Sequence, residues 1–178
     1  LNQSIGRQHH GAPGSKGKQK LVMGPWEHAV GKMPVGQLTF PNANRVPAQY
    51  DALRWFAHHL KGVDNGIEKE PAVAYYVMGD TGTPGAPGNE WRYADDWPIA
   101  AKETAVYLTT DKKLSLKAPE AGVAPHEYTF DPANPCPTVG GHNLTIDRGS
   151  MDQRKIASRD DVLVFTSDVI NKPIEVTC

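Results

Sequence analysis

One histidine of this 178-residue chain, His28, follows the kind of sequence that delivers a side chain to a catalytic position. Leu21 to Met23 form a short apolar run, typical of the end of a buried strand. Gly24-Pro25 ends the run, because proline has no N–H group for a strand ladder. His28 is therefore expected in a loop at a strand end, where open α/β sheets place their chemistry. An imidazole exchanges protons near neutral pH, so His28 is a candidate general base.

A serine hydrolase also needs a nucleophile and a carboxylate that orients the base. The chain has six serines, and none lies in the Gly-x-Ser-x-Gly turn that exposes a nucleophilic hydroxyl in α/β-hydrolases: Ser4, Ser15, Ser115, Ser150, Ser158 and Ser167. The order in that fold is serine, then acid, then histidine. No aspartate precedes His28, since the first is Asp51. We therefore expect the nucleophile and the acid upstream of Leu1, and the chain to be a fragment.

Metal-dependent hydrolysis is the rival chemistry, and the sequence argues against it. Glu27-His28 is not part of a His-Glu-x-x-His motif, and no two histidines stand four residues apart. The pair His9-His10 is a poor metal site, because adjacent side chains diverge and because no third ligand stands at a useful spacing. His58 and His59 are expected at the edge of a helix surface. We predict no metal and no cofactor.

Residues 22–28, Val-Met-Gly-Pro-Trp-Glu-His, resemble the histidine motif of the cocaine esterase-like (CocE/NonD) serine hydrolases, with Glu27 where Ser or Thr is usual. Later segments resemble further blocks of that family in order, and Ala57 stands where Asp is common. These segments are Arg54–Gly62, Tyr76–Gly79, Glu90–Arg92, Asp96–Pro98, Asp131–Gly141, Met151–Arg154 and Asp161–Ser167.

This resemblance implies a parent enzyme that cleaves ester or amide bonds with a Ser-His-Asp triad, of which this chain holds only the base, His28. The family includes α-amino-acid ester hydrolases, cephalosporin (glutaryl-7-ACA) acylases and Xaa-Pro dipeptidyl-peptidases, so ester, β-lactam amide and Xaa-Pro peptide substrates stay open. The fragment alone is expected to be inactive. Trp26 should pack beneath the histidine loop, and Glu27 should point away and matter little.

The predicted fold is α/β plus β: the C-terminal part of an α/β-hydrolase fold at residues 1–99, then an incomplete jelly-roll β-sandwich at residues 102–178. An apolar stripe predicts a helix between Pro47 and Gly62, and residues 72–78 are rich in strand formers. The jelly roll is implied by the resemblance and by short strand candidates separated by turns, at residues 105–109, 127–130, 161–166 and 174–177.

A non-catalytic binding or structural module with a carbohydrate-type jelly roll is the alternative. Trp91 and Trp97 could then form a sugar platform, although we expect both to be buried where the two domains meet. Cys136 and Cys178 have no metal-type spacing and are weak evidence for a disulfide.

The composition of the chain limits the kinds of partner that it can bind. A net charge of −1 gives no electrostatic basis for binding nucleic acid or an anionic membrane, and no apolar run approaches a membrane-spanning length. The expected partners are a small ester or amide substrate and the missing N-terminal part of the same chain. A homo-oligomer stays open, and the compartment is not indicated.

Overall fold

A three-stranded mixed sheet organises the N-terminal half of the computed structural model, which describes residues 1–177. β1 (Leu21–Met23) pairs in parallel with β2 (Val73–Val77), and β2 pairs antiparallel with β3 (Glu90–Ala94). Parallel strands need a long crossover, and α2 (Ala52–Lys61) lies within it. The strands predicted at residues 21–23 and 72–78 are confirmed. β3 was not predicted as a strand.

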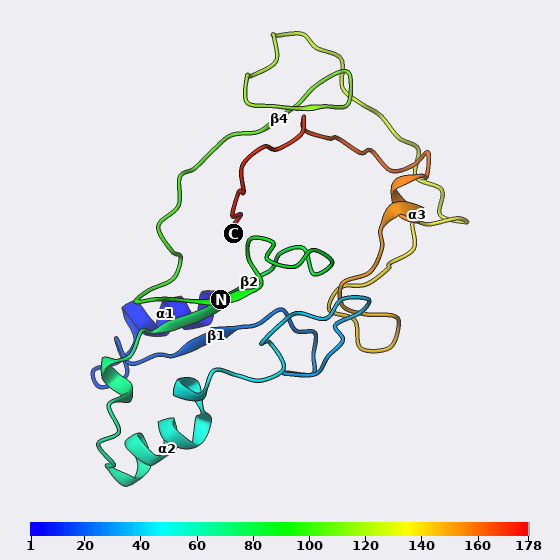
Figure 1. Cartoon of the computed structure of the whole chain (residues 1–178). Coiled ribbons are helices and arrows are strands. Elements are labelled where there is room, and N and C mark those ends of the chain that lie inside the picture. The colour runs from blue at the N-terminus through cyan, green and yellow to red at the C-terminus, as the bar shows by residue number, and fades with distance from the viewer. Residues whose placement is uncertain (178) are drawn as a thin grey trace.

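The two faces of this sheet carry different layers, because successive side chains of a strand point to opposite sides. On one face Tyr75 packs edge-on against Trp97, with ring centroids 5.9 Å apart. Ile5 of α1 (Asn2–His10) lines a small apolar cavity with Val73 and Trp97 on that side. Figure 1 shows α1 beside β1 and β2.

The opposite face holds the small core. Tyr76 lies there with Val35, Phe40 and Ala43, all buried, and Trp26, Met33 and Trp91 pack against this cluster. The segment that follows the predicted histidine loop therefore folds back over the sheet that presents the loop. Burial of these apolar side chains is the main force that fixes the segment.

Local signals determine where α2 begins and ends. Asp51 caps its start, because the carboxylate accepts a hydrogen bond from the Leu53 N–H at 2.7 Å. Gly62 ends it in the left-handed conformation at φ 68°, as expected from its position. Between Pro47 and Asp51 the chain forms a short 3₁₀ turn, η1 (Ala48–Tyr50), so the predicted helix is confirmed with a later start. A second 3₁₀ turn, η2 (Ile67–Lys69), precedes β2.

The apolar stripe of α2 faces solvent. Leu53 is 77% exposed, Leu60 75% and Phe56 50%. No residue of this helix is buried. An amphipathic helix normally buries its stripe, so α2 presents an apolar face that residues 1–177 do not cover.

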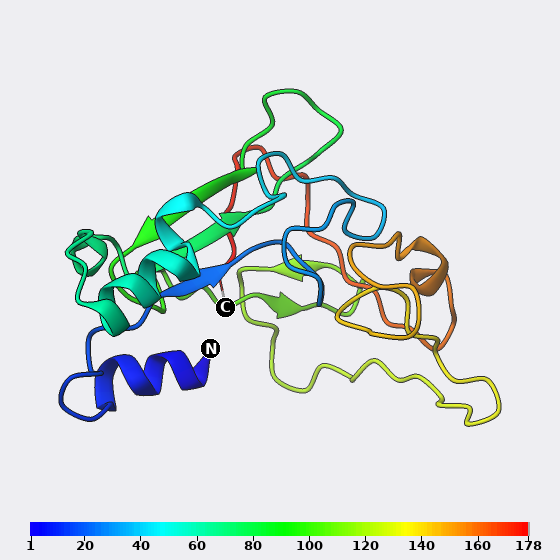
Figure 2. The same ribbon diagram turned by 90° about the horizontal axis from the view of Figure 1, so that it is seen from below.

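The C-terminal half differs from the prediction. Within residues 102–177 the structure has β4 (Tyr107–Leu108) paired with β5 (Leu114–Ser115), and the short helix α3 (Arg154–Ala157). The predictions of strands at residues 127–130 and 174–177 are wrong. The strand predicted at residues 161–166 is reduced to a single bridge at Thr166. Strand-forming residues make a strand only where a second backbone pairs with them. Figures 1 and 2 show this half as long loops extending from the sheet.

The two tryptophans expected at the domain junction pack inside the first half instead. Trp97 is 9% exposed and contacts Tyr75 on the α1 side of the sheet. Trp91 is half-buried against Trp26 and Tyr76 on the other side. Their burial fits the packing interpretation, but they are not held between two halves.

Candidate active-site loop

The loop that carries His28 leaves the carboxyl end of β1, beside the parallel strand β2. The position agrees with the prediction from the strand, Gly-Pro, histidine order. In an open α/β sheet this edge is where ligands bind. The close approach of Gly24 to the next residues explains its identity, because a Cβ there would lie 2.4 Å from the Trp26 ring.

Trp26 anchors this loop from below, as expected. Its indole Nε1–H donates to the backbone carbonyl of Ala43 at 2.5 Å, and Ala43 is fully buried. Its ring also packs against Trp91, with centroids 5.6 Å apart. The loop is therefore tied to the core two positions before His28.

His28 itself is exposed. Within residues 1–177, the rings of His9, His58 and His126 make hydrogen bonds, and the ring of His28 makes none. An accessible imidazole on an anchored loop can accept or release a proton at a bound molecule. No serine or aspartate of the described residues is hydrogen-bonded to it, so the triad claim stays a prediction.

Glu27, which we expect from the sequence to point away and matter little, is held by a distant residue. Its side chain is only 6% exposed, and an oxygen lies 2.9 Å from Nε of Arg148. Arg148 is far along the chain, in the half predicted to form a separate domain. Sequence reasoning missed the pair because nothing local in residues 22–28 points to Arg148.

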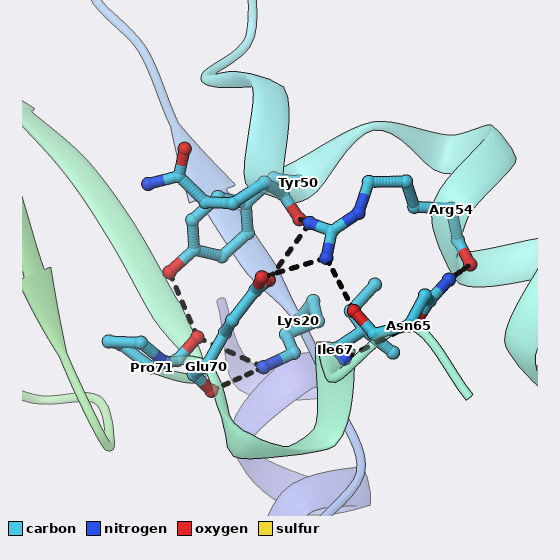
Figure 3. A network of polar contacts seen from close by, with 8 residues as sticks. Lys20, Tyr50, Arg54, Asn65, Ile67, Glu70 and Pro71 are labelled. Carbon is cyan, nitrogen blue, oxygen red and sulfur yellow. Dashed lines mark hydrogen bonds and ion pairs between the residues drawn. The ribbon is translucent and has the colours of Figure 1, made fainter.

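A polar network on the other side of α2 fixes the approach to the strands (Figure 3). Arg54 donates to both carboxylate oxygens of Glu70, at 2.9 and 3.2 Å. It also donates to the carbonyls of Gln49 at 2.7 Å and Asn65 at 2.9 Å. The hydrogen bonds to Glu70 raise the pKa of Arg54. One guanidinium on α2 thus joins η1, the connection between α2 and η2, and the segment that enters β2.

Lys20 and Tyr50 complete this network at the start of β1. The Lys20 ammonium donates to the carbonyls of Glu70 at 2.5 Å and Pro71 at 3.1 Å. Tyr50 donates to the same Pro71 carbonyl at 2.9 Å. Burial lowers the pKa of Lys20 and raises the pKa of Tyr50 to about 12. These contacts hold β1 and β2 in register and are structural in character.

The structure also brings together His58, His59 and Glu68, whose ligand atoms lie within 4.8 Å of one another. No sequence pattern indicates this group, because Glu68 reaches α2 from η2. Glu68 Oε1 lies 2.9 Å from the Lys18 ammonium and 3.4 Å from Nε2 of His58. The hydrogen bond to Lys18 is the main cause that lowers the pKa of Glu68, and His58 lowers it further. Lys18 already supplies the positive charge that a metal ion would bring.

The structure thus combines a mixed sheet and its crossover helix with an extended C-terminal half. An exposed histidine stands on the loop at the carboxyl end of a parallel strand. Residues 65–177 match the family model described as "X-Pro dipeptidyl-peptidase C-terminal non-catalytic domain". The chain belongs to this family.

Curated relatives agree with the resemblance to the cocaine esterase-like group, which is confirmed. The chain is 33% identical to "Cocaine esterase" of Rhodococcus sp. over 181 residues, which covers 89% of this chain and 29% of that protein. It is 31% identical over 168 residues to "Putative serine esterase Mb1866c" of Mycobacterium bovis, covering 88% of this chain and 24% of that protein. The chain therefore spans about a quarter of the length of these relatives.

His28 lies outside the family match, which begins at residue 65 and so includes β2 and β3 as well as the C-terminal half. The predicted division near residues 99–102 stays a prediction. None of the helices in the described part of the chain has the length and apolarity that a membrane crossing requires.

Proposed function

We propose that this chain belongs to a serine hydrolase that cleaves ester or amide bonds, in which His28 is the general base. One observation carries the proposal: an exposed imidazole on a loop that leaves the carboxyl end of a parallel strand and is anchored by Trp26. The names of the curated relatives, esterases in each case, agree with this chemistry.

In the proposed mechanism His28 takes the proton of a serine hydroxyl as that oxygen attacks the acyl carbon. It then gives the proton to the leaving alcohol or amine, and repeats the exchange with water to release the acid. The serine and the carboxylate come from residues that precede this chain in the longer protein. In this proposal the loop at the carboxyl end of β1 presents the imidazole to them.

The same proposal assigns a partner to the exposed face of α2. Leu53, Phe56 and Leu60 would be covered by the rest of the catalytic domain, since a contiguous apolar surface of this kind normally marks a contact. Residues 102–178 would complete their jelly roll against strands from elsewhere in the protein. The chain alone should then be poorly soluble and inactive.

The alternative of a carbohydrate-binding module has less support. A sugar platform needs exposed aromatic faces, and Trp97 is buried while Trp91 packs against the core cluster. The non-catalytic description of the matched family applies to residues 65–177 and so leaves His28 outside it.

The test is His28→Gln in the full-length protein, assayed on p-nitrophenyl esters. Loss of a triad member lowers kcat by roughly 10³–10⁶-fold. Circular dichroism should show that the variant keeps the wild-type fold. His10→Gln is the matched control, because His10 is also exposed but lies on α1. Full activity in His28→Gln would end the proposal. Residues 1–178 alone should hydrolyse these esters no faster than free imidazole.

A further inference from the structure

A segment of the C-terminal half, residues 148–152, is docked on the loop that carries His28. Gly36 and Ser150 form a parallel bridge. The Gln37 N–H donates to the Ser150 carbonyl at 2.8 Å, and the Ser150 N–H donates to the Val35 carbonyl at 3.3 Å. The Asp152 N–H donates to the side chain of Gln37 at 2.7 Å. Figures 1 and 2 both show the two segments side by side.

The contact is too close for side chains at its centre. Gly149 has a φ of 81°, and a Cβ on it would lie 2.4 Å from the Gly36 nitrogen. Gly36 has a φ of 63°, and its Cβ would lie 2.5 Å from the Ser150 carbonyl oxygen. Two glycines in left-handed conformations therefore let the two backbones touch, which argues for a defined interface.

The charged part of this interface lies directly beside the proposed base. Arg148 reaches Glu27, the residue before His28, at 2.9 Å. The Glu27 side chain is 6% exposed and that of Arg148 33%, so the pair is largely shielded from water. A carboxylate withdrawn from water needs its partner, because an unpaired buried charge is strongly unfavourable. The position of Glu27 is thus tied to Arg148.

We infer that Arg148 is a positioning residue for His28: by holding Glu27, the segment 148–152 fixes the backbone from which the imidazole projects. The inference rests on the proposed function of His28. Trp26 fixes the loop two residues before His28 through its hydrogen bond to Ala43. Arg148 fixes the loop one residue before His28 through its ion pair with Glu27. The region matched as a non-catalytic domain would then supply part of the support of the active site.

The test compares Arg148→Gln with Arg159→Gln in the full-length protein. Arg159 is the matched control: it pairs with Asp161 at 2.6 Å, the two side chains are 21% and 16% exposed, and its described partners lie away from residues 22–37. A small displacement of a reacting group can cost about 100-fold in rate, so Arg148→Gln should lower kcat roughly 10–100-fold with KM little changed. Arg159→Gln should leave kcat near the wild-type value.

Two further variants separate positioning from general destabilisation. Arg148→Lys keeps the positive charge and should recover most of the lost kcat. Glu27→Gln keeps the size of the side chain but removes its charge, and should lower kcat as Arg148→Gln does. The double variant should then be no worse than either single one, because both break the same pair. If Arg148→Gln does not fold, Arg148→Lys and Glu27→Gln still decide the matter by their kcat values.

Equal losses of kcat in Arg148→Gln and Arg159→Gln would overturn the inference, and so would a rise in KM with kcat unchanged. Additive effects in the double variant would overturn it as well. These outcomes are distinct from failure of the proposed function, which shows as an active His28→Gln. A dead His28→Gln beside an unaffected Arg148→Gln would refute the positioning role alone.

Discussion

Replacing Trp26 by Phe tests whether the histidine loop is held by a buried hydrogen bond. The substitution keeps an aromatic ring in the core cluster but removes the indole N–H that donates to Ala43. Ala43 is 0% exposed, so its carbonyl is withdrawn from bulk solvent when the donor is lost. Trp91→Phe is a close match, because the Trp91 N–H donates to the neighbouring carbonyl of Asn42 at 2.9 Å, and Asn42 is exposed.

The expected difference follows from the two carbonyls. An unsatisfied buried acceptor costs about 1–3 kcal/mol, whereas an ordinary hydrogen bond contributes a net ~0.5–1.5 kcal/mol when water can take its place. Both substitutions remove the same atoms from half-buried rings, so the loss of packing is similar in the two. The hydrogen bond alone should therefore make Trp26→Phe more costly than Trp91→Phe by roughly 0.5–1.5 kcal/mol.

Urea unfolding of the full-length protein, followed by far-ultraviolet circular dichroism, measures this difference. The kinetics provide a second readout, since only Trp26 lies two residues from His28: Trp26→Phe should lower kcat, and Trp91→Phe should not. Equal losses of stability would refute the argument from burial. A lower kcat in Trp91→Phe alone would show that the wrong tryptophan has been assigned to the loop.

Two more predictions concern the network of Figure 3. Arg54→Met should lower the urea midpoint more than Arg92→Met, because Arg54 donates to two backbone carbonyls as well as to Glu70, whereas the partners of Arg92 are the side chains of Glu90 and Glu175; equal shifts would contradict this. Tyr50 has a pKa raised by burial from 10.0 to about 12, so its protonated form contributes stability that is present below pH 10 and lost as the pH rises through 12. Tyr50→Phe should remove that part of the alkaline loss, and absorbance at 295 nm in the wild type should show one tyrosine titrating near pH 12; a single transition near pH 10 would contradict this.

The sequence determined what depends on short-range chemistry. Leu21 to Met23 form a strand because an apolar run meets a Gly-Pro break, and that order places His28 on a loop at the strand end. The end of α2 could be read from Gly62, since glycine adopts the left-handed conformation without a steric cost. The family could be recognised because its motifs occur in the family's order along the chain. Each motif is a short run of residues, so it can be identified without knowing the fold.

Tertiary structure alone decided which distant groups meet. Arg148 pairs with Glu27, and Glu68 reaches His58, because the fold brings together segments whose sequences carry no mark of each other. The expected strands at 127–130 and 174–177 did not form, since strand-forming residues need a second backbone to pair with. The apolar stripe of α2 could be predicted from the helical spacing of its apolar residues. Whether residues 1–177 cover that stripe depends on which other segments pack against α2, and the sequence of one helix does not contain that information.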